Sequence, residues 1–65
     1  MITFPHRVYV IELDQPFENW YGDLLSYYPN SDFAEVETNN EVVKKVRLDL
    51  ILDADSGKPI TELLF

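Results

Sequence analysis

The chain has no cysteine, and in a protein of 65 residues this absence limits the fold more than any other feature of the sequence. A chain of this length buries only about 60% of the surface that it exposes when unfolded, so its margin of stability is thin. Disulfides and thiolate-bound metals, which support many small domains, are not available here. Apolar residues make up 46% of the chain, enough for one hydrophobic core. We therefore expect residues 1–65 to form a single domain, stabilised by good packing, by homodimerisation or by a partner.

The segment from Phe17 to Tyr28 carries apolar residues at helical spacing. They fall at i, i+3, i+4, i+7 and i+11, on one face of a helix of about three turns. These residues are Phe17, Trp20, Tyr21, Leu24 and Tyr28. Asp14 precedes them as an N-cap, and Pro29 disfavours helical geometry at the residue before it. The pattern predicts one amphipathic helix.

Two alternating segments around Asn39-Asn40 predict a β-hairpin. They are Phe33–Thr38 and Glu41–Leu52, and asparagine tolerates the positive φ of a two-residue turn. The second segment alternates apolar and charged residues, as a half-buried antiparallel strand does. The register set by a two-residue turn forms cross-strand pairs of opposite charge, Glu35 with Lys44 and Asp32 with Arg47.

Two further strands complete the expected fold. Val8–Leu13 is rich in β-branched residues and predicts a buried strand. Ile60–Phe65 follows a turn at Asp55–Lys58 and predicts a short returning strand. The fold class is therefore α+β, with one helix packed on a small antiparallel sheet of three to four strands in the order β-α-β-β-(β).

The sequence offers little catalytic chemistry. Its single histidine, His6, lies near the N-terminus, and no pattern of a nucleophile with its base accompanies it. The segment Asp53–Gly57 resembles the start of a calcium-binding loop, but Lys58 and Leu64 stand where that loop needs glycine and glutamate. A polar turn explains the segment better. We expect a protein that is not an enzyme and that holds no cofactor or metal.

Twelve carboxylates against five lysines and arginines give a net charge of −7. A field of this sign repels nucleic acid and anionic membranes and attracts basic grooves. The candidate acidic contacts flank the predicted helix or lie on the hairpin: Asp14, Glu18, Asp23, Glu35, Glu37 and Glu41. The candidate apolar contacts are aromatic: Phe17, Trp20 and Tyr21. Two simpler interpretations stay open, namely aromatic residues that only fill the core and acids that only form a solvated surface.

Two short windows resemble the small uracil-DNA glycosylase inhibitors of Bacillus phages. That family carries Phe-Glu-x-x-Tyr-Gly on a helix, similar to Phe17–Gly22 (FENWYG), and a strand similar to Glu41–Asp49 (EVVKKVRLD). In that family the helix phenylalanine and tyrosine help to form an apolar pocket of a homodimer. The pocket captures a side chain from the DNA-intercalating loop of the enzyme, while acidic groups mimic DNA phosphates. The resemblance implies pocket roles for Phe17 and Tyr21, with Glu18 beside them.

The leading hypothesis is therefore a small acidic inhibitor of phage type that binds the DNA-contacting surface of an enzyme as a DNA mimic, with uracil-DNA glycosylase as the favoured target. Two alternatives stay open: an anti-CRISPR or other anti-defence inhibitor of a nucleic-acid-binding complex, and a structural or adaptor module. The expected partner is a protein with a basic DNA-binding groove, not nucleic acid or a membrane, and a homodimer stays open. No signal-peptide pattern or bilayer-length apolar stretch is visible. We expect a cytoplasmic location, in the host cell if the source is a phage.

Overall fold

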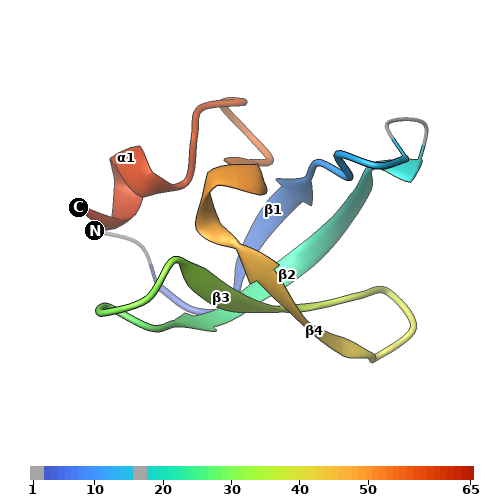
Figure 1. The fold of residues 1–65 in the computed structure, drawn as a ribbon, viewed down its shortest axis with the longest axis horizontal. Helices are drawn as coiled ribbons and strands as arrows, with labels where there is room; N and C mark the ends of the chain where they lie inside the picture. Colours follow the sequence, from blue (N-terminus) through green and yellow to red (C-terminus); the bar gives the residue numbers. More distant parts are fainter. Residues whose placement is uncertain (1–2, 16–17) are drawn as a thin grey trace.

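Five antiparallel strands form one sheet in the computed structural model, which describes residues 3–15 and 18–65 (Figure 1). The strands are β1 (His6–Val10), β2 (Trp20–Tyr27), β3 (Phe33–Glu37), β4 (Val43–Arg47) and β5 (Ile51–Asp53). A short 3-10 turn, η2 (Leu48–Leu50), links β4 to β5, and the α-helix α1 (Thr61–Leu64) has four residues. The predicted α+β fold, with a helix packed on three to four strands, is therefore wrong.

The segment 20–27 forms β2 instead of the predicted helix. The prediction failed because a bulge in this strand gives its core-facing side chains the spacing of one helix face. The register with β3 shifts at Leu25, so the alternation of side chains changes by one residue. As a result Trp20, Leu24 and Tyr27 all pack toward the core. These positions are i, i+4 and i+7, which is also the spacing of one helix face. Aromatic residues favour strands and glycine disfavours helices, so local propensity agrees with β2.

The sheet is rolled up, because its two edge strands are neighbours in the sequence. The strand order is β4-β3-β2-β1-β5, so β4 and β5 lie at opposite edges. Five flat strands would hold their edges about 19 Å apart. The link from Arg47 to Ile51 spans at most about 14 Å even when extended, and the 3-10 turn shortens it further. Figure 1 shows this link passing from the end of β4 to β1, where Ile51 pairs with Val10.

The inner face of the rolled sheet holds the hydrophobic core. Its buried residues come from all strands except β4, and from η2 and the segment before α1: Val8, Val10, Leu24, Ala34, Val36, Leu48, Ile51 and Ile60. Gly22 allows β2 and β3 to approach closely there. A Cβ at Gly22 would lie 2.7 Å from the backbone oxygen of Glu37 and 2.6 Å from the Trp20 ring. The close approach that glycine permits therefore occurs within a sheet.

The predicted hairpin is present, but its register is wrong by one residue. Glu35 pairs with Lys45 instead of Lys44, and Phe33 pairs with Arg47. The turn has one residue more than predicted, namely Glu41, which adopts a positive φ of 63°. The Thr38 carbonyl accepts a hydrogen bond from the Glu41 amide at 3.1 Å. A three-residue loop with its last residue in the left-handed region is the next most common hairpin type after the two-residue turn.

The expected returning strand Ile60–Phe65 is also wrong, since most of it forms α1. The residues just before α1 instead cover the free edge of β5. The Asp53 amide donates to the Lys58 carbonyl at 2.8 Å, and the Ile60 amide donates to the Ile51 carbonyl at 2.9 Å. Ile60 itself is fully buried, so this cover also closes the core.

Candidate interaction surface

Alternation along the strands places a mixed set of aromatic and charged side chains on the outer face of the sheet. The core residues of β1, β2 and β3 point inward, so the residues between them point outward. We call the aromatic and acidic members of this outward set the acidic–aromatic face: Tyr9, Tyr21, Asp23, Glu35 and Glu37. Arg7 belongs to the same outward set and stands opposite Asp23. The register places Tyr9 opposite Tyr21, and Asp23 opposite Glu37.

The aromatic part of this face is well exposed for so small a domain. Tyr21 is 50% exposed, and its ring lies 4.7 Å from that of Tyr9, centroid to centroid, with 56° between the planes. The guanidinium carbon of Arg7 lies 5.9 Å from the Tyr21 ring centroid. A tyrosine held by a neighbouring ring loses little conformational freedom on binding, which suits it to act as an interface anchor.

The acidic part of the face is only partly neutralised by the protein itself. Asp23 lies 3.5 Å from the Arg7 guanidinium, and Glu35 accepts a hydrogen bond from the Tyr28 hydroxyl at 2.5 Å. That bond to a carboxylate raises the pKa of Tyr28. Within the described residues Glu37 makes no ion pair. It stands opposite a second carboxylate, that of Asp23. Like charges at directly opposite positions destabilise a sheet, so a cationic partner would relieve this pair.

The remaining predicted acidic contacts lie at one end of the molecule. Asp14 and Glu18 are exposed in the connection between β1 and β2, and Glu41 is exposed in the hairpin between β3 and β4. Both connections lie at the right-hand end in Figure 1. The structure therefore divides the six predicted acids into three on the sheet face and three at this end.

The predicted aromatic contacts do not form one surface. Tyr21 points outward, whereas Trp20 packs against the core and its Nε1 donates a hydrogen bond to Glu12 at 2.6 Å. Phe17 lies outside the described residues. Sequence reasoning missed Tyr9. Alternation with buried Val8 and Val10 points it outward, but its place beside Tyr21 depends on the pairing of β1 with β2.

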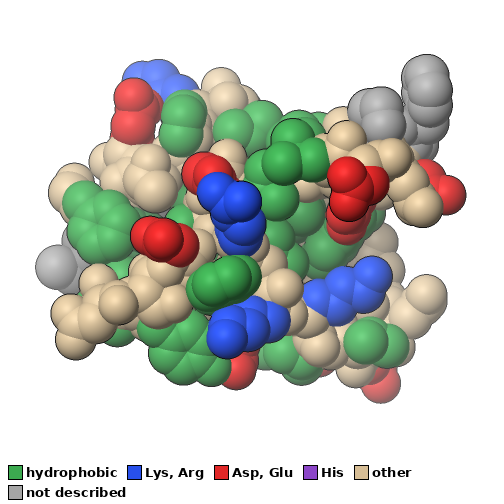
Figure 2. Space-filling model, in the orientation of Figure 1, with side chains coloured by type: hydrophobic (Ala, Val, Ile, Leu, Met, Phe, Trp, Pro, Cys, Tyr) green, Lys and Arg blue, Asp and Glu red, His purple; other side chains and the backbone are tan. Residues whose placement is uncertain are grey.

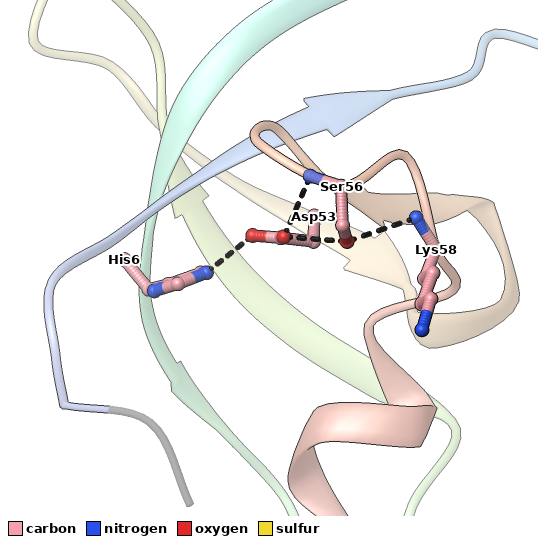
Figure 3. A network of polar contacts seen from close by, with 4 residues as sticks. All are labelled: His6, Asp53, Ser56 and Lys58. Carbon is pink, nitrogen blue, oxygen red and sulfur yellow. Dashed lines mark hydrogen bonds and ion pairs between the residues drawn. The ribbon is translucent and has the colours of Figure 1, made fainter.

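His6 belongs to a part-buried polar network (Figure 3), in which Asp53 is buried and Ser56 is exposed. Its Nε2 lies 2.7 Å from Asp53 Oδ1, and Asp53 Oδ2 accepts hydrogen bonds from the backbone amide and the hydroxyl of Ser56 at 2.9 and 2.7 Å. The bonds from Ser56 and then from His6 lower the pKa of Asp53 to about 2. The order His6–Asp53–Ser56 puts the carboxylate between histidine and serine, so the serine hydroxyl contacts the carboxylate and not the imidazole, unlike in a catalytic triad. The network connects β1 to the turn after β5.

No group of three or more histidine or acidic side chains in residues 3–15 and 18–65 has the geometry to hold a metal ion. In the same part of the chain no helix is long and apolar enough to cross a membrane. A comparison of the sequence and the fold with protein families, characterised proteins and solved structures finds no match.

Proposed function

We propose that this chain is a small binding protein that presents its acidic–aromatic face to the basic, DNA-contacting surface of a protein partner and thereby blocks that surface. The single observation that carries the proposal is the placement of Asp23 opposite Glu37 beside the half-exposed ring of Tyr21. Fixed carboxylates beside a rigid aromatic anchor combine electrostatic steering with a contact that buries apolar area.

The geometry of a strand supports a phosphate-like arrangement of these acids. Residues two apart on one strand lie about 6.6 Å apart, and residues directly opposite on neighbouring strands lie about 5 Å apart. Glu35 and Glu37 follow the first spacing along β3, and Asp23 and Glu37 follow the second. The result is a compact group of negative charges on a rigid sheet.

Uracil-DNA glycosylase is the first target to test, because of the resemblance of Phe17–Gly22 to the phage inhibitors of that enzyme. The fold limits which residues of this motif can contact a partner. The second half of the motif lies on β2, where Tyr21 faces outward and Trp20 faces the core. The proposal therefore rests on Tyr21 and the sheet acids, and not on a helix-borne pocket. Other nucleic-acid-binding complexes carry basic grooves of the same kind.

The experiment measures inhibition of glycosylase activity and, in parallel, protein captured from host lysate by the immobilised chain. We expect near-stoichiometric inhibition that Glu37→Lys and Tyr21→Ala each weaken at least tenfold. Asp55→Lys is the matched control for the charge change, because Asp55 is exposed in the turn after β5 and is not a member of this face. Inhibition lost equally in the control would mean that overall charge is responsible. Unchanged activity at large excess of the chain, together with capture of no DNA-binding protein, would refute the proposal.

A further inference from the structure

β4 is an edge strand whose outward backbone groups have no partner in the part of the chain that the structure describes. The even-numbered residues along β4 form the backbone hydrogen bonds to β3. At the two ends of β4, the Thr38 amide donates to the Val42 carbonyl at 2.8 Å and the Leu48 amide donates to the Asp32 carbonyl at 2.7 Å. In an antiparallel pair the residues between these point their amide and carbonyl groups away from the partner strand. On β4 those residues are Val43, Lys45 and Arg47. Such an edge is a template for another strand.

The basic residues of this acidic protein gather on the same edge. Three of the five lysines and arginines lie on β4, namely Lys44, Lys45 and Arg47. Figure 2 shows Lys and Arg side chains following β4 across this face, with acidic side chains around them. In a chain of net charge −7, this strand is therefore a local basic stripe.

The two lysines leave the edge backbone accessible. Lys44 Nζ lies 5.6 Å from the Trp20 ring centroid on the inner side, and Lys45 Nζ lies 4.7 Å from the Phe33 ring centroid on the outer side. These cation–π contacts hold the charged groups along the two sides of the sheet. Lysines on edge strands often prevent pairing, but here they lie flat against rings instead of projecting across the edge.

A groove of about 320 Å³ runs beside this edge. Its wall opposite β4 is formed by the chain that leaves β1 and by the end of η2, with Val10, Ile11 and Leu50 as apolar lining. From β4 itself, Val46 faces the same space. The groove therefore offers apolar contact on the inner side of a strand added to β4.

We propose that β4 binds an extended acidic segment of a partner protein, which adds to the sheet as a sixth strand. This edge borders the acidic–aromatic face, since Lys45 stands opposite Glu35, but it uses the open backbone of β4 and goes beyond the proposed function. The basic side chains of β4 indicate which kind of molecule binds to its edge. A second copy of the chain is disfavoured, since antiparallel self-pairing centred on Lys45 puts two lysines directly opposite each other. Nucleic acid is disfavoured because it has no peptide backbone to pair with the open amide and carbonyl groups of β4.

The side chains of β4 specify the segment in antiparallel register. Carboxylates are expected opposite Arg47, Lys45 and Lys44, and β-branched apolar residues opposite Val46 and Val43. A peptide of sequence Thr-Glu-Val-Glu-Glu-Val-Thr, blocked at both ends, meets this pattern. Main-chain hydrogen bonds provide the affinity of strand addition, and alternate side chains provide the specificity.

The test titrates this peptide into the isotope-labelled protein and follows backbone amide shifts. We expect saturable shifts centred on the amides of Val43, Lys45 and Arg47, which would also become protected from hydrogen exchange. N-methylation of the peptide at the glutamate opposite Lys45 removes a main-chain donor, and it should weaken binding at least tenfold. Equal binding of the N-methylated peptide, or no shift at millimolar peptide, would overturn the proposal.

Protein variants separate the edge from overall charge. Lys45→Glu should weaken peptide binding at least tenfold, whereas Lys58→Glu, the same charge change in an exposed turn, should leave it within twofold. Lys45→Gln is the variant to use if Lys45→Glu lowers the melting temperature, because it places no second carboxylate opposite Glu35. Equal effects at Lys45 and Lys58 would overturn the proposal. So would a single-stranded oligonucleotide that shifts the same amides more strongly than the peptide does.

Discussion

The two edges of the rolled sheet differ in whether their outward backbone groups are hydrogen-bonded. At the β5 edge, the outward backbone groups of Ile51 and Asp53 are both used, by the Ile60 amide and the Lys58 carbonyl. At the β4 edge, the equivalent groups of Val43, Lys45 and Arg47 have no partner among the described residues. The chain thus uses residues 54–60 to close one edge and leaves the other open.

The β5 edge and the β4 edge therefore contribute differently to stability and to binding. The covered edge carries buried Ile60 and the network of His6, Asp53 and Ser56, so it contributes to the core. The open edge carries exposed side chains, with Val43 at 50% exposure, and contributes little buried area. Open edges invite association, and natural proteins usually blunt them. We therefore expect mutations at the β5 edge to change stability and mutations at the β4 edge to change binding.

The largest effect is expected at the cover of β5. Ile60→Ala removes a fully buried side chain, and substitutions of this kind cost about 2–5 kcal/mol of unfolding free energy. Urea denaturation of the variant and the parent measures the difference. A loss below about 1 kcal/mol would mean that the cover is not part of the core.

Asp53→Asn is expected to have the next largest effect. A hydrogen-bonded carboxylate contributes about 1.5–3 kcal/mol, and the variant loses its charge. Since the folded-state pKa of Asp53 is lowered from 3.8 to about 2, its contribution is present above pH 3.8 and is lost as the pH falls toward 2. The unfolding free energies of parent and variant should therefore differ most near neutral pH and converge below pH 2. A difference that does not change between pH 6 and pH 2 would contradict this account.

Val43→Thr on the open edge should change stability least. The side chain is half exposed and the β-branched shape is kept, so the expected change is within about 0.5 kcal/mol. Thermal unfolding measured beside the Ile60→Ala variant gives the comparison directly. A loss comparable to that of Ile60→Ala would show that the β4 edge is covered in solution.

Part of this fold could be predicted from the sequence. The alternation after the turn at Asn39-Asn40 correctly indicated a hairpin, because period-two patterning of a half-buried strand is local information. The single strand predicted over Glu41–Leu52 was wrong, because η2 interrupts it and Ile51–Asp53 forms β5 at the opposite edge of the sheet. The helix was wrong because the bulge at Leu25 gives β2 the spacing of a helix face. The pairing that decides between the two comes from β1 and β3, which are distant in the sequence. The hairpin register failed at Glu41, whose positive φ is not a preference of glutamate.

The candidate site was predictable to a similar extent. Asp23, Glu35 and Glu37 were identified from charge, and the sheet brings them onto one face. Their neighbour Tyr9 was missed, since its position depends on the pairing of β1 with β2. The contact of His6 was also missed: strand alternation from Val8 places it on the inner side, where it meets Asp53 from the far end of the chain. Contacts between residues this far apart cannot be derived from local pattern.

Backbone amide hydrogen exchange distinguishes the open edge of the sheet from the closed one. We expect alternation along β4, with fast exchange at Val43, Lys45 and Arg47 and slow exchange at Lys44 and Val46, while the outward amide of Asp53 on β5 is protected. Uniform protection along β4 in the isolated protein would instead show that this edge already has a partner strand.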